Sequence, residues 1–290
     1  MSEYHDAMKT IRTIESVRSV LKDVRAQGKS VGFVPTMGYL HEGHLSLVKA
    51  SLKKTDCTVV SIFVNPTQFG PEEDFKEYPR DLERDNQLLE ELNVDILFYP
   101  DPAEMYPPGF STYVEVERLQ DIWEGRSRPG HFRGVCTVVL KLFNIVHPDI
   151  AFFGQKDAQQ AILLKKMVDD LNSNFRIEVL PTVREEDGLA LSSRNVYLTS
   201  EQREAATCLS RSLDEAARMI RSGERRTAPI LERMRGIVEA EDLAKLDYIA
   251  IVDTDFLEPL DEIEREALIA LAVFFDRVRL IDNIMVTVEE

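Results

Sequence analysis

Over roughly the first 180 residues, hydrophobic and polar positions follow two repeating patterns. Short apolar runs are typical of buried strands, and the segments between them repeat apolar residues every three or four positions, as amphipathic helices do. The expected strands are 31–34, 58–64, 95–99, 150–153 and 175–180, and the expected helices are 9–27, about 41–52, 80–92, 132–146 and 157–171. This alternation predicts an α/β domain with a parallel sheet covered by helices on both faces.

The pattern changes near residue 183. Two expected helices, 200–222 and 227–242, come first, and the expected strands 247–252, 267–275 and 279–288 follow them. Helices grouped before strands indicate a separate α+β domain. We therefore expect an α/β domain in residues 1–182 and a smaller α+β domain in residues 183–290.

Composition and charge narrow the classes of function. The chain has 51 acidic and 35 basic residues and a net charge of −16, which disfavours general nucleic-acid binding. No apolar run approaches the roughly 18 residues of a membrane span, and the N-terminal segment lacks the apolar core of an export signal. The three cysteines are far apart and odd in number, which favours reduced thiols. We expect a cytoplasmic protein that binds neither nucleic acid nor membrane.

The first segment with chemical character is His41-Glu42-Gly43-His44, at an expected strand-to-helix turn. The two histidines share one side of the helix, beside the unpaired backbone N–H groups of its first turn, which suits a phosphate. Gly38 and Gly43 would let a nucleotide approach the backbone. A capping segment and a pair of metal ligands are the alternatives, although no third metal ligand with suitable spacing is evident.

Two further segments suit a nucleotide. Lys156, within Gly154-Gln155-Lys156-Asp157, could reach phosphates after the strand at 150–153, whereas a solvated turn is the alternative. The loop 187–195 offers two serine hydroxyls and an arginine for a triphosphate, at Ser192, Ser193 and Arg194. A serine-rich linker between domains is the alternative for that loop.

Other polar residues suggest a small substrate. The amides of Asn65 and Gln68 suit hydroxyl and carbonyl groups, and Arg128 suits a carboxylate or a phosphate. Tyr78 is either a helix-entry residue or a cleft residue. Asp85 is expected to be an exposed helical acid, with a metal ligand as the less favoured role. The alternatives for the amides and for Arg128 are a satisfied turn and a surface charge.

These segments together carry a resemblance. VPTMGYLHEGHLSLV, VVSIFVNPTQFGPEEDFKEYPRDLERD, RPGHFRGVCTVVLKLFNIVHPDIAFFGQKDAQQ and PTVREEDGLALSSRNVYLT cover most of residues 31–199. In this order they resemble the pantothenate synthetase (pantoate–β-alanine ligase) family. The resemblance implies a Rossmann-like domain of the nucleotidylyltransferase type, with HEGH as its HxGH signature and SSRN as its second signature. Leu191 departs from the methionine usual there, an apolar exchange that should preserve nucleotide packing.

The resemblance also implies a reaction and partners. The substrates would be pantoate, β-alanine and ATP, and the products pantothenate, AMP and pyrophosphate, by way of a bound pantoyl adenylate. The family usually requires Mg²⁺ and usually forms a homodimer. The residues that would hold the metal are not identified by the resemblance. The C-terminal domain would act as a lid.

Site residues follow from the matching motifs. The resemblance implies catalytic roles for His44 as proton donor, with His41 as its partner, and for Lys156, Ser192, Ser193 and Arg194. It implies that ATP is bound by Met37, Gly38, Tyr39, Leu40, His41, Glu42, Gly43, His44, Gly154, Gln155, Lys156, Asp157, Val183, Leu191, Ser192, Ser193 and Arg194. Gln68 and Gln160 would bind pantoate, and Asn65, Arg128 and Tyr78 are further substrate candidates.

Two rival functions stay open at this point. Another member of the same superfamily would transfer a nucleotidyl group to a phosphorylated acceptor, and the identity of the product separates it from a ligase. A nucleotide-sensing or scaffold protein would bind ATP without consuming it. The presence of the complete set of histidines, lysine, serines and arginine argues against the second rival.

Overall fold

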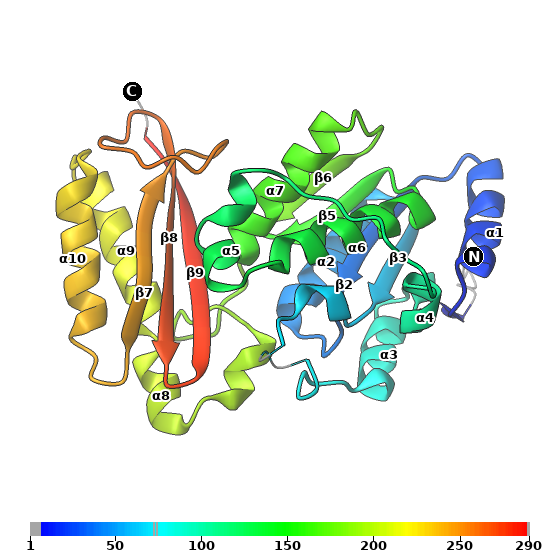
Figure 1. Cartoon of the computed structure of the whole chain (residues 1–290), viewed down its shortest axis with the longest axis horizontal. Coiled ribbons are helices and arrows are strands. Elements are labelled where there is room, and N and C mark those ends of the chain that lie inside the picture. The colour runs from blue at the N-terminus through cyan, green and yellow to red at the C-terminus, as the bar shows by residue number, and fades with distance from the viewer. Residues whose placement is uncertain (1–6, 72, 74, 289–290) are drawn as a thin grey trace, which may run out of the picture. The chain divides into compact units, whose positions relative to one another are not determined.

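The computed structural model of the chain describes residues 7–71, 73 and 75–288, which form two compact units (Figure 1). The first unit comprises Met1–Gly154 and Gln159–Leu180, and the second comprises Gln155–Ala158 and Pro181–Glu290. By its contacts, the short segment Gln155–Ala158 therefore belongs with the C-terminal part of the chain.

The first unit is built on a six-stranded sheet whose neighbouring strands are all parallel. Its strands are β1 (Lys9–Ile11), β2 (Val31–Thr36), β3 (Cys57–Ile62), β4 (Ile96–Phe98), β5 (Ile150–Gly154) and β6 (Arg176–Leu180), in the order β1-β4-β3-β2-β5-β6. The chain moves from β2 to β3 and β4 on one side and then returns to β5 on the other side of β2. In such sheets, ligands bind at the carboxyl ends of the strands beside this reversal.

Helices and apolar side chains cover both faces of this sheet. The helices are α1 (Ile14–Ala26), α2 (Glu42–Lys54), α3 (Leu82–Glu91), α4 (Pro102–Met105), α5 (Glu124–Ser127), α6 (His131–Val146) and α7 (Ala158–Asp170). Consecutive strand residues point to opposite faces. Val34 packs in one core with Phe152, whereas Phe33 meets Phe143 of α6 edge to face, with ring centroids 6.4 Å apart. The predicted Rossmann-like α/β architecture is confirmed.

The second unit is the predicted α+β arrangement. It contains α8 (Ser200–Ala205), α9 (Cys208–Arg221) and α10 (Thr227–Glu239), followed by the antiparallel strands β7 (Lys245–Val252), β8 (Glu266–Phe275) and β9 (Val278–Thr287). In Figure 1 the yellow helices α9 and α10 lie beside the orange and red strands β7–β9. Their apolar side chains form one core.

Two expected helices differ from the structure. Residues Lys9–Ile11 form a strand, because they pair with β4, and α1 begins only at Ile14, where the Thr13 side chain accepts the N–H of Ser16. The expected helix 200–222 is divided into α8 and α9 at residues 206–207. Among the described residues, no helix combines the length and the apolar character needed to cross a membrane.

Candidate active site

The turn between β2 and α2 carries the first predicted nucleotide residues, Met37 to Leu40. Gly38 has a φ of 85° and Tyr39 a φ of 53°, so the backbone turns sharply through the left-handed region. A Cβ on Gly38 would lie 2.9 Å from the Ile62 side chain and 3.1 Å from the Asp85 carboxylate, so the turn has no room for a side chain there. Glycine is required at this position by both its φ and its packing.

Asp85 of α3 holds this turn in place. Its side chain is 1% exposed, and its two oxygens accept the backbone N–H groups of Tyr39 and Leu40, each at 2.7 Å. Burial raises the pKa of the Asp85 carboxyl, and the two backbone hydrogen bonds oppose that rise. The expectation of an exposed acid is therefore wrong: the helix turns this residue inward, toward backbone donors that lie some 45 positions earlier in the chain.

The side chains of His41 and His44 cap the N-terminus of α2, and their rings lie next to each other. The Nδ1 atom of His41 accepts the N–H of Gly43 at 3.1 Å, and the Nδ1 atom of His44 accepts the N–H of His41 at 3.3 Å. The two rings stand 4.1 Å apart between centroids. Because each Nδ1 acts as an acceptor, a neutral ring carries its proton on Nε2. Both histidines therefore cap the helix through Nδ1.

The amides after β3 form a compact cluster. Asn65 is 1% exposed, and its amide nitrogen donates to the Gln68 side-chain oxygen and to the carbonyl of Gly134, both at 3.1 Å. The Gln68 amide nitrogen lies 2.9 Å from the sulfur of Met37. The structure thus brings Met37, Asn65 and Gln68 together. A thioether is a weak acceptor, so the Gln68 amide would gain by donating to an oxygen instead.

Arg128 is not the simple surface charge of the alternative interpretation. Its side chain is 18% exposed, and its guanidinium contacts both carboxylate oxygens of Glu73, with Nε 3.0 Å from each. It also lies 3.1 Å from Nε2 of His131, whose Nδ1 is 2.9 Å from the carbonyl oxygen of Gln68. Arg128 is therefore connected to the amide cluster and already holds one carboxylate.

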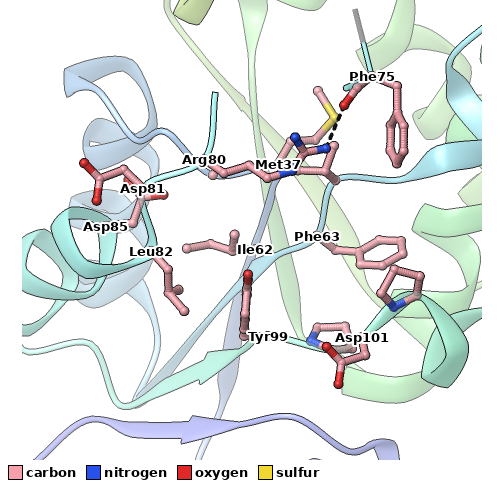
Figure 2. Close-up of a pocket in the computed structure, with 14 residues that line it drawn as sticks. Met37, Ile62, Phe63, Phe75, Arg80, Asp81, Leu82, Asp85, Tyr99 and Asp101 are labelled. Carbon is pink, nitrogen blue, oxygen red and sulfur yellow. Dashed lines mark hydrogen bonds between the residues drawn. The ribbon is translucent and has the colours of Figure 1, made fainter. Parts of the chain in front are cut away.

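A pocket of about 160 Å³ opens at the carboxyl ends of β2, β3 and β4 (Figure 2). Its lining includes Met37, Gly38, Ile62, Phe63, Val64, Phe75, Arg80, Asp81, Leu82, Asp85, Tyr99, Pro100, Asp101 and Pro102. Figure 2 shows the Arg80 guanidinium joined to the Phe75 carbonyl oxygen, a hydrogen bond of 2.7 Å. Tyr78 is 6% exposed, and its ring lies edge-on to Phe69. Tyr78 is thus a buried residue in the segment between the pocket-lining residues Phe75 and Arg80. It is not the first residue of a helix, because α3 begins at Leu82.

Gln160 and Gly154 lie in the first unit as well. Gly154 ends β5, the strand that pairs with β2. Gln160 is partly exposed on α7, whereas its neighbour Gln159 is 4% exposed and donates to the carbonyls of Leu119 and Ile122. Gln159 therefore uses its side chain to hold the segment 119–122, whereas Gln160 is the more accessible of the two glutamines.

Lys156 lies in the second unit, in the 3-10 turn Gln155–Asp157. Its Nζ is 3.9 Å from the Asp157 carboxylate, beyond hydrogen-bonding distance, and its side chain is 20% exposed. The turn is held by Asn283 of β9, which the sequence interpretation did not single out. Lys156 is therefore a cation with a fixed backbone and a lightly engaged side chain.

The predicted serine loop follows a small hairpin in the same unit. The N–H of Leu191 donates to the carbonyl of Val183 at 3.0 Å, which closes the hairpin. The Ser192 hydroxyl then accepts the N–H of Arg194 and caps the 3-10 turn Ser193–Tyr197. Val183, Leu191 and the serine loop are thus joined locally. The loop is an ordered turn with two half-buried serines and not an extended linker.

No metal centre is formed by protein side chains within residues 7–71, 73 and 75–288, where no three His, Cys, Asp or Glu residues could hold an ion together. Both oxygens of Asp85 are occupied by backbone donors, which also disfavours it as a metal ligand. Mg²⁺ commonly binds through substrate phosphates with only one or two carboxylates.

Comparison with known proteins gives a consistent result over nearly the whole chain. A family model described as pantoate-beta-alanine ligase matches residues 9–285. The pantothenate synthetase of Pelotomaculum thermopropionicum is 56% identical over 276 residues, 95% of this chain and 98% of that protein. The pantothenate synthetase of Acetivibrio thermocellus is 54% identical over 281 residues, 97% of this chain and all of that protein.

Solved structures show the same likeness. The crystal structure of pantothenate synthetase from Thermus thermophilus superposes with a TM-score of 0.91 at 47% identity, covering 96% of this chain and 99% of that one. The pantoate-beta-alanine ligase of Francisella tularensis, crystallised with β-γ ATP and β-alanine, has a TM-score of 0.76 at 38% identity, covering 96% and 98%.

Proposed function

The chain belongs to the pantoate–β-alanine ligase family, and from that premise we propose how its residues carry out the ATP-dependent joining of pantoate to β-alanine. The observation that carries the proposal is the family match over residues 9–285, together with the capped HEGH turn that follows β2, where the strand order of the sheet reverses. We propose a pantoyl adenylate as the intermediate. Pantothenate, AMP and pyrophosphate are then the products.

The chemistry explains why an adenylate is needed. A carboxylate is a poor acceptor for an amine, because its carbonyl is resonance-stabilised and would have to expel oxide. In the first step a pantoate carboxylate oxygen attacks the α-phosphorus of ATP, and the bond to pyrophosphate breaks. In the second step the β-alanine amine attacks the pantoyl carbonyl, AMP leaves and the amine loses a proton. Such a protein acts chiefly by positioning the reactants and stabilising charge.

In the first unit, the α2 N-terminus is the proposed phosphate site. Met37 to His44 form its wall, and His44 and His41 each present an Nε2–H donor because their Nδ1 atoms are engaged in the cap. The backbone N–H groups and the positive end of the helix dipole add to the attraction for phosphate. His44 thereby supplies the proton or hydrogen bond that stabilises charge as the α-phosphate is attacked.

In the second unit, Lys156 and the serine loop are the proposed cationic partners of the phosphates. Lys156 neutralises charge on the departing pyrophosphate, and its weak contact with Asp157 leaves it available for that task. Leu191, Ser192, Ser193 and Arg194 bind the phosphates as well. Gly154, Gln155 and Asp157 serve the ribose side, and Val183 serves the adenine. Both sets of residues act on one ATP molecule in this proposal.

The amide cluster is the proposed substrate site. Gln68 and Gln160 bind pantoate, and Asn65 fixes the orientation of Gln68 through its amide. The contact of Gln68 with the Met37 sulfur supports this, because a pantoate oxygen is a better acceptor than a thioether. Arg128 and Tyr78 are the proposed neighbours of the β-alanine. The ability of Arg128 to hold a carboxylate is evident from its pairing with Glu73.

Mg²⁺, the homodimer and a cytoplasmic location complete the proposal. Mg²⁺ would arrive bound to ATP and supply neutralising charge at the phosphates. The second unit would act as a lid that keeps water from the adenylate. Light scattering on the purified chain tests the dimer.

The experiment that tests this function is a product assay. Purified protein is incubated with ATP, Mg²⁺ and pantoate, with and without β-alanine, and the products are identified by mass spectrometry. We expect pantothenate and AMP only with all components. Lys156→Ala should lose activity by about 100-fold or more. Lys166→Ala should behave as wild type, because Lys166 is a partly exposed lysine that pairs only locally, with Asp170 on the same helix. An active Lys156→Ala enzyme overturns the assignment, and ATP bound without turnover favours a sensor.

A further inference from the structure

Two adjacent polar residues interrupt the apolar run of β9. Asp282 and Asn283 are 2% and 4% exposed, and they face opposite sides of the strand. Asp282 pairs in register with Leu271, on the face packed against the helices, and Asn283 pairs with Ala270 on the other face. Buried polar groups destabilise a fold unless they are hydrogen-bonded. Their partners therefore show what they do.

Asn283 recognises the backbone of the Gln155–Lys156 turn. Its amide nitrogen donates to the carbonyls of Gln155 at 3.0 Å and Lys156 at 2.8 Å, and its amide oxygen accepts the side-chain N–H of Gln155 at 2.9 Å. The Asn283 side-chain amide thus uses both of its N–H donors and its oxygen acceptor to bind two successive residues, Gln155 and Lys156. Of the twenty side chains, few offer two N–H donors and one acceptor at this length. The contact fixes the peptide units from which the Lys156 side chain extends.

Asp282 holds the hairpin 183–191, which leads into the serine loop. Its carboxylate accepts two hydrogen bonds from the Arg184 guanidinium, at 2.6 and 3.0 Å. Arg184 also donates to the carbonyl of Gly188 at 3.0 Å, and so ties the hairpin 183–191 to β9. Burial by itself would lower the pKa of the Arg184 guanidinium, but hydrogen bonding and charge attraction to Asp282 outweigh it and raise that pKa. The serine loop begins directly after this hairpin, at Ser192.

We propose that Asp282 and Asn283 are positioning residues that hold Lys156 and the loop Ser192–Arg194 in fixed register with each other through one strand. The inference rests on the proposed function, in which these segments handle the phosphates of ATP. It gives these two residues of β9 a supporting role in nucleotide binding, although neither of them is expected to touch the nucleotide. It also explains why Gln155–Ala158 belongs by its contacts with the C-terminal unit.

The test is a single-turnover measurement of pyrophosphate release from ATP and pantoate without β-alanine. Asn283→Asp keeps the size of the side chain but sets a carboxylate against two carbonyl oxygens. We expect it to slow pyrophosphate release at least ten-fold, because misplacement of a catalytic group by about 1 Å can lower a rate by about 100-fold. The KM for β-alanine should not change. Amide hydrogen exchange at residues 155–158 should become faster.

Leu280→Ala is the matched control. Leu280 lies on the same strand and is 5% exposed in the core, but its apolar side chain makes no hydrogen bond to either segment. It should lower the melting temperature while the folded enzyme keeps its rate of pyrophosphate release. If Asn283→Asp folds poorly, Asn283→Ser, which adds neither charge nor bulk, is measured in its place with the same expectation.

The outcomes separate this inference from the proposed function. If Lys156→Ala releases pyrophosphate at the wild-type rate, the proposed function is wrong whatever Asn283→Asp does. If Lys156→Ala is slow and the folded Asn283 variants are as fast as wild type, only the positioning role is overturned. Slowing of Leu280→Ala to the same extent as Asn283→Asp would also overturn it, because the effect would then be one of general destabilisation.

Discussion

Replacing Gly134 by alanine tests how closely α6 supports the amide cluster. A Cβ at this position would lie 2.3 Å from the carbonyl oxygen of Thr67 and 2.6 Å from Cα of Gln68. Both are backbone atoms, so no side-chain rotation relieves the clash. To restore an ordinary contact of 3.4 Å, the carbonyl oxygen must retreat by about 1 Å. The turn that carries Gln68 would have to move with it.

The expected change in the free energy of unfolding for Gly134→Ala is the balance of two opposing contributions. Alanine is favoured over glycine in a helix interior by about 1 kcal/mol, and overpacking against fixed atoms costs about 3 kcal/mol. Gly134→Ala should therefore destabilise the chain by about 2 kcal/mol, equivalent to roughly 6 °C in melting temperature for a unit of this size. Gly236→Ala is the control: this glycine lies in α10 with nothing within 4 Å of its added Cβ, so it should stabilise by about 1 kcal/mol.

The assay combines calorimetry with steady-state kinetics. Displacement of Gln68 by about 1 Å should lower kcat/KM for pantoate by about 10- to 100-fold, with the KM for ATP much less affected. Gly236→Ala should keep wild-type kinetics. A Gly134→Ala enzyme that is as stable as Gly236→Ala, or that binds pantoate normally, would refute the argument that α6 sets the position of Gln68.

Three further predictions concern buried and charged groups. Asp85→Asn leaves one acceptor for two backbone donors and should lower kcat/KM for ATP by about ten-fold, and an unchanged value in steady-state assays would contradict this. Burial raises the pKa of each cysteine thiol to about 12, so native protein near pH 8 should resist alkylation that the unfolded chain undergoes, and rapid labelling would disprove it. The Arg218 and Arg233 guanidinium groups lower the pKa of Glu215 to about 2 from 4.5, so its stabilisation is present above about pH 4.5 and is lost as pH falls toward 2. Glu215→Gln should therefore lower the melting temperature at neutral pH but not near pH 2.

Periodicity was sufficient for the parallel sheet because each strand and helix of the first unit buries a face of its own. The expected strand 150–153 is β5, Ile150–Gly154, and the expected helix 132–146 is α6, His131–Val146. The error at Lys9–Ile11 has a different origin. Three residues at the edge of a sheet form a strand only because β4 lies beside them, and no local pattern contains that neighbour.

The candidate site was predictable where a side chain sits on its own turn. The HEGH segment caps α2 with its own histidines, as the capping alternative for that segment predicted. Ser192 likewise caps the turn that follows it, a local role that was not predicted for the loop. Asp85 was misjudged for the converse reason. Its partners are backbone N–H groups of another element, and the periodicity of α3 gives no indication of which outward position meets a neighbour.

Asn283 shows what signal could have found such a residue. The run Leu280 to Val286 of β9 is apolar except for Asp282 and Asn283, and both of these polar side chains are buried. A buried amide or carboxylate persists only where partners satisfy it. A polar pair inside an apolar strand is therefore enough to predict a specific contact with another part of the chain. What the strand alone cannot specify is the partner, because Gln155 and Arg184 are separated from it by about 100 residues or more. The fold supplies that identity: one partner is the turn that carries Lys156, and the other is the hairpin that directly precedes the serine loop.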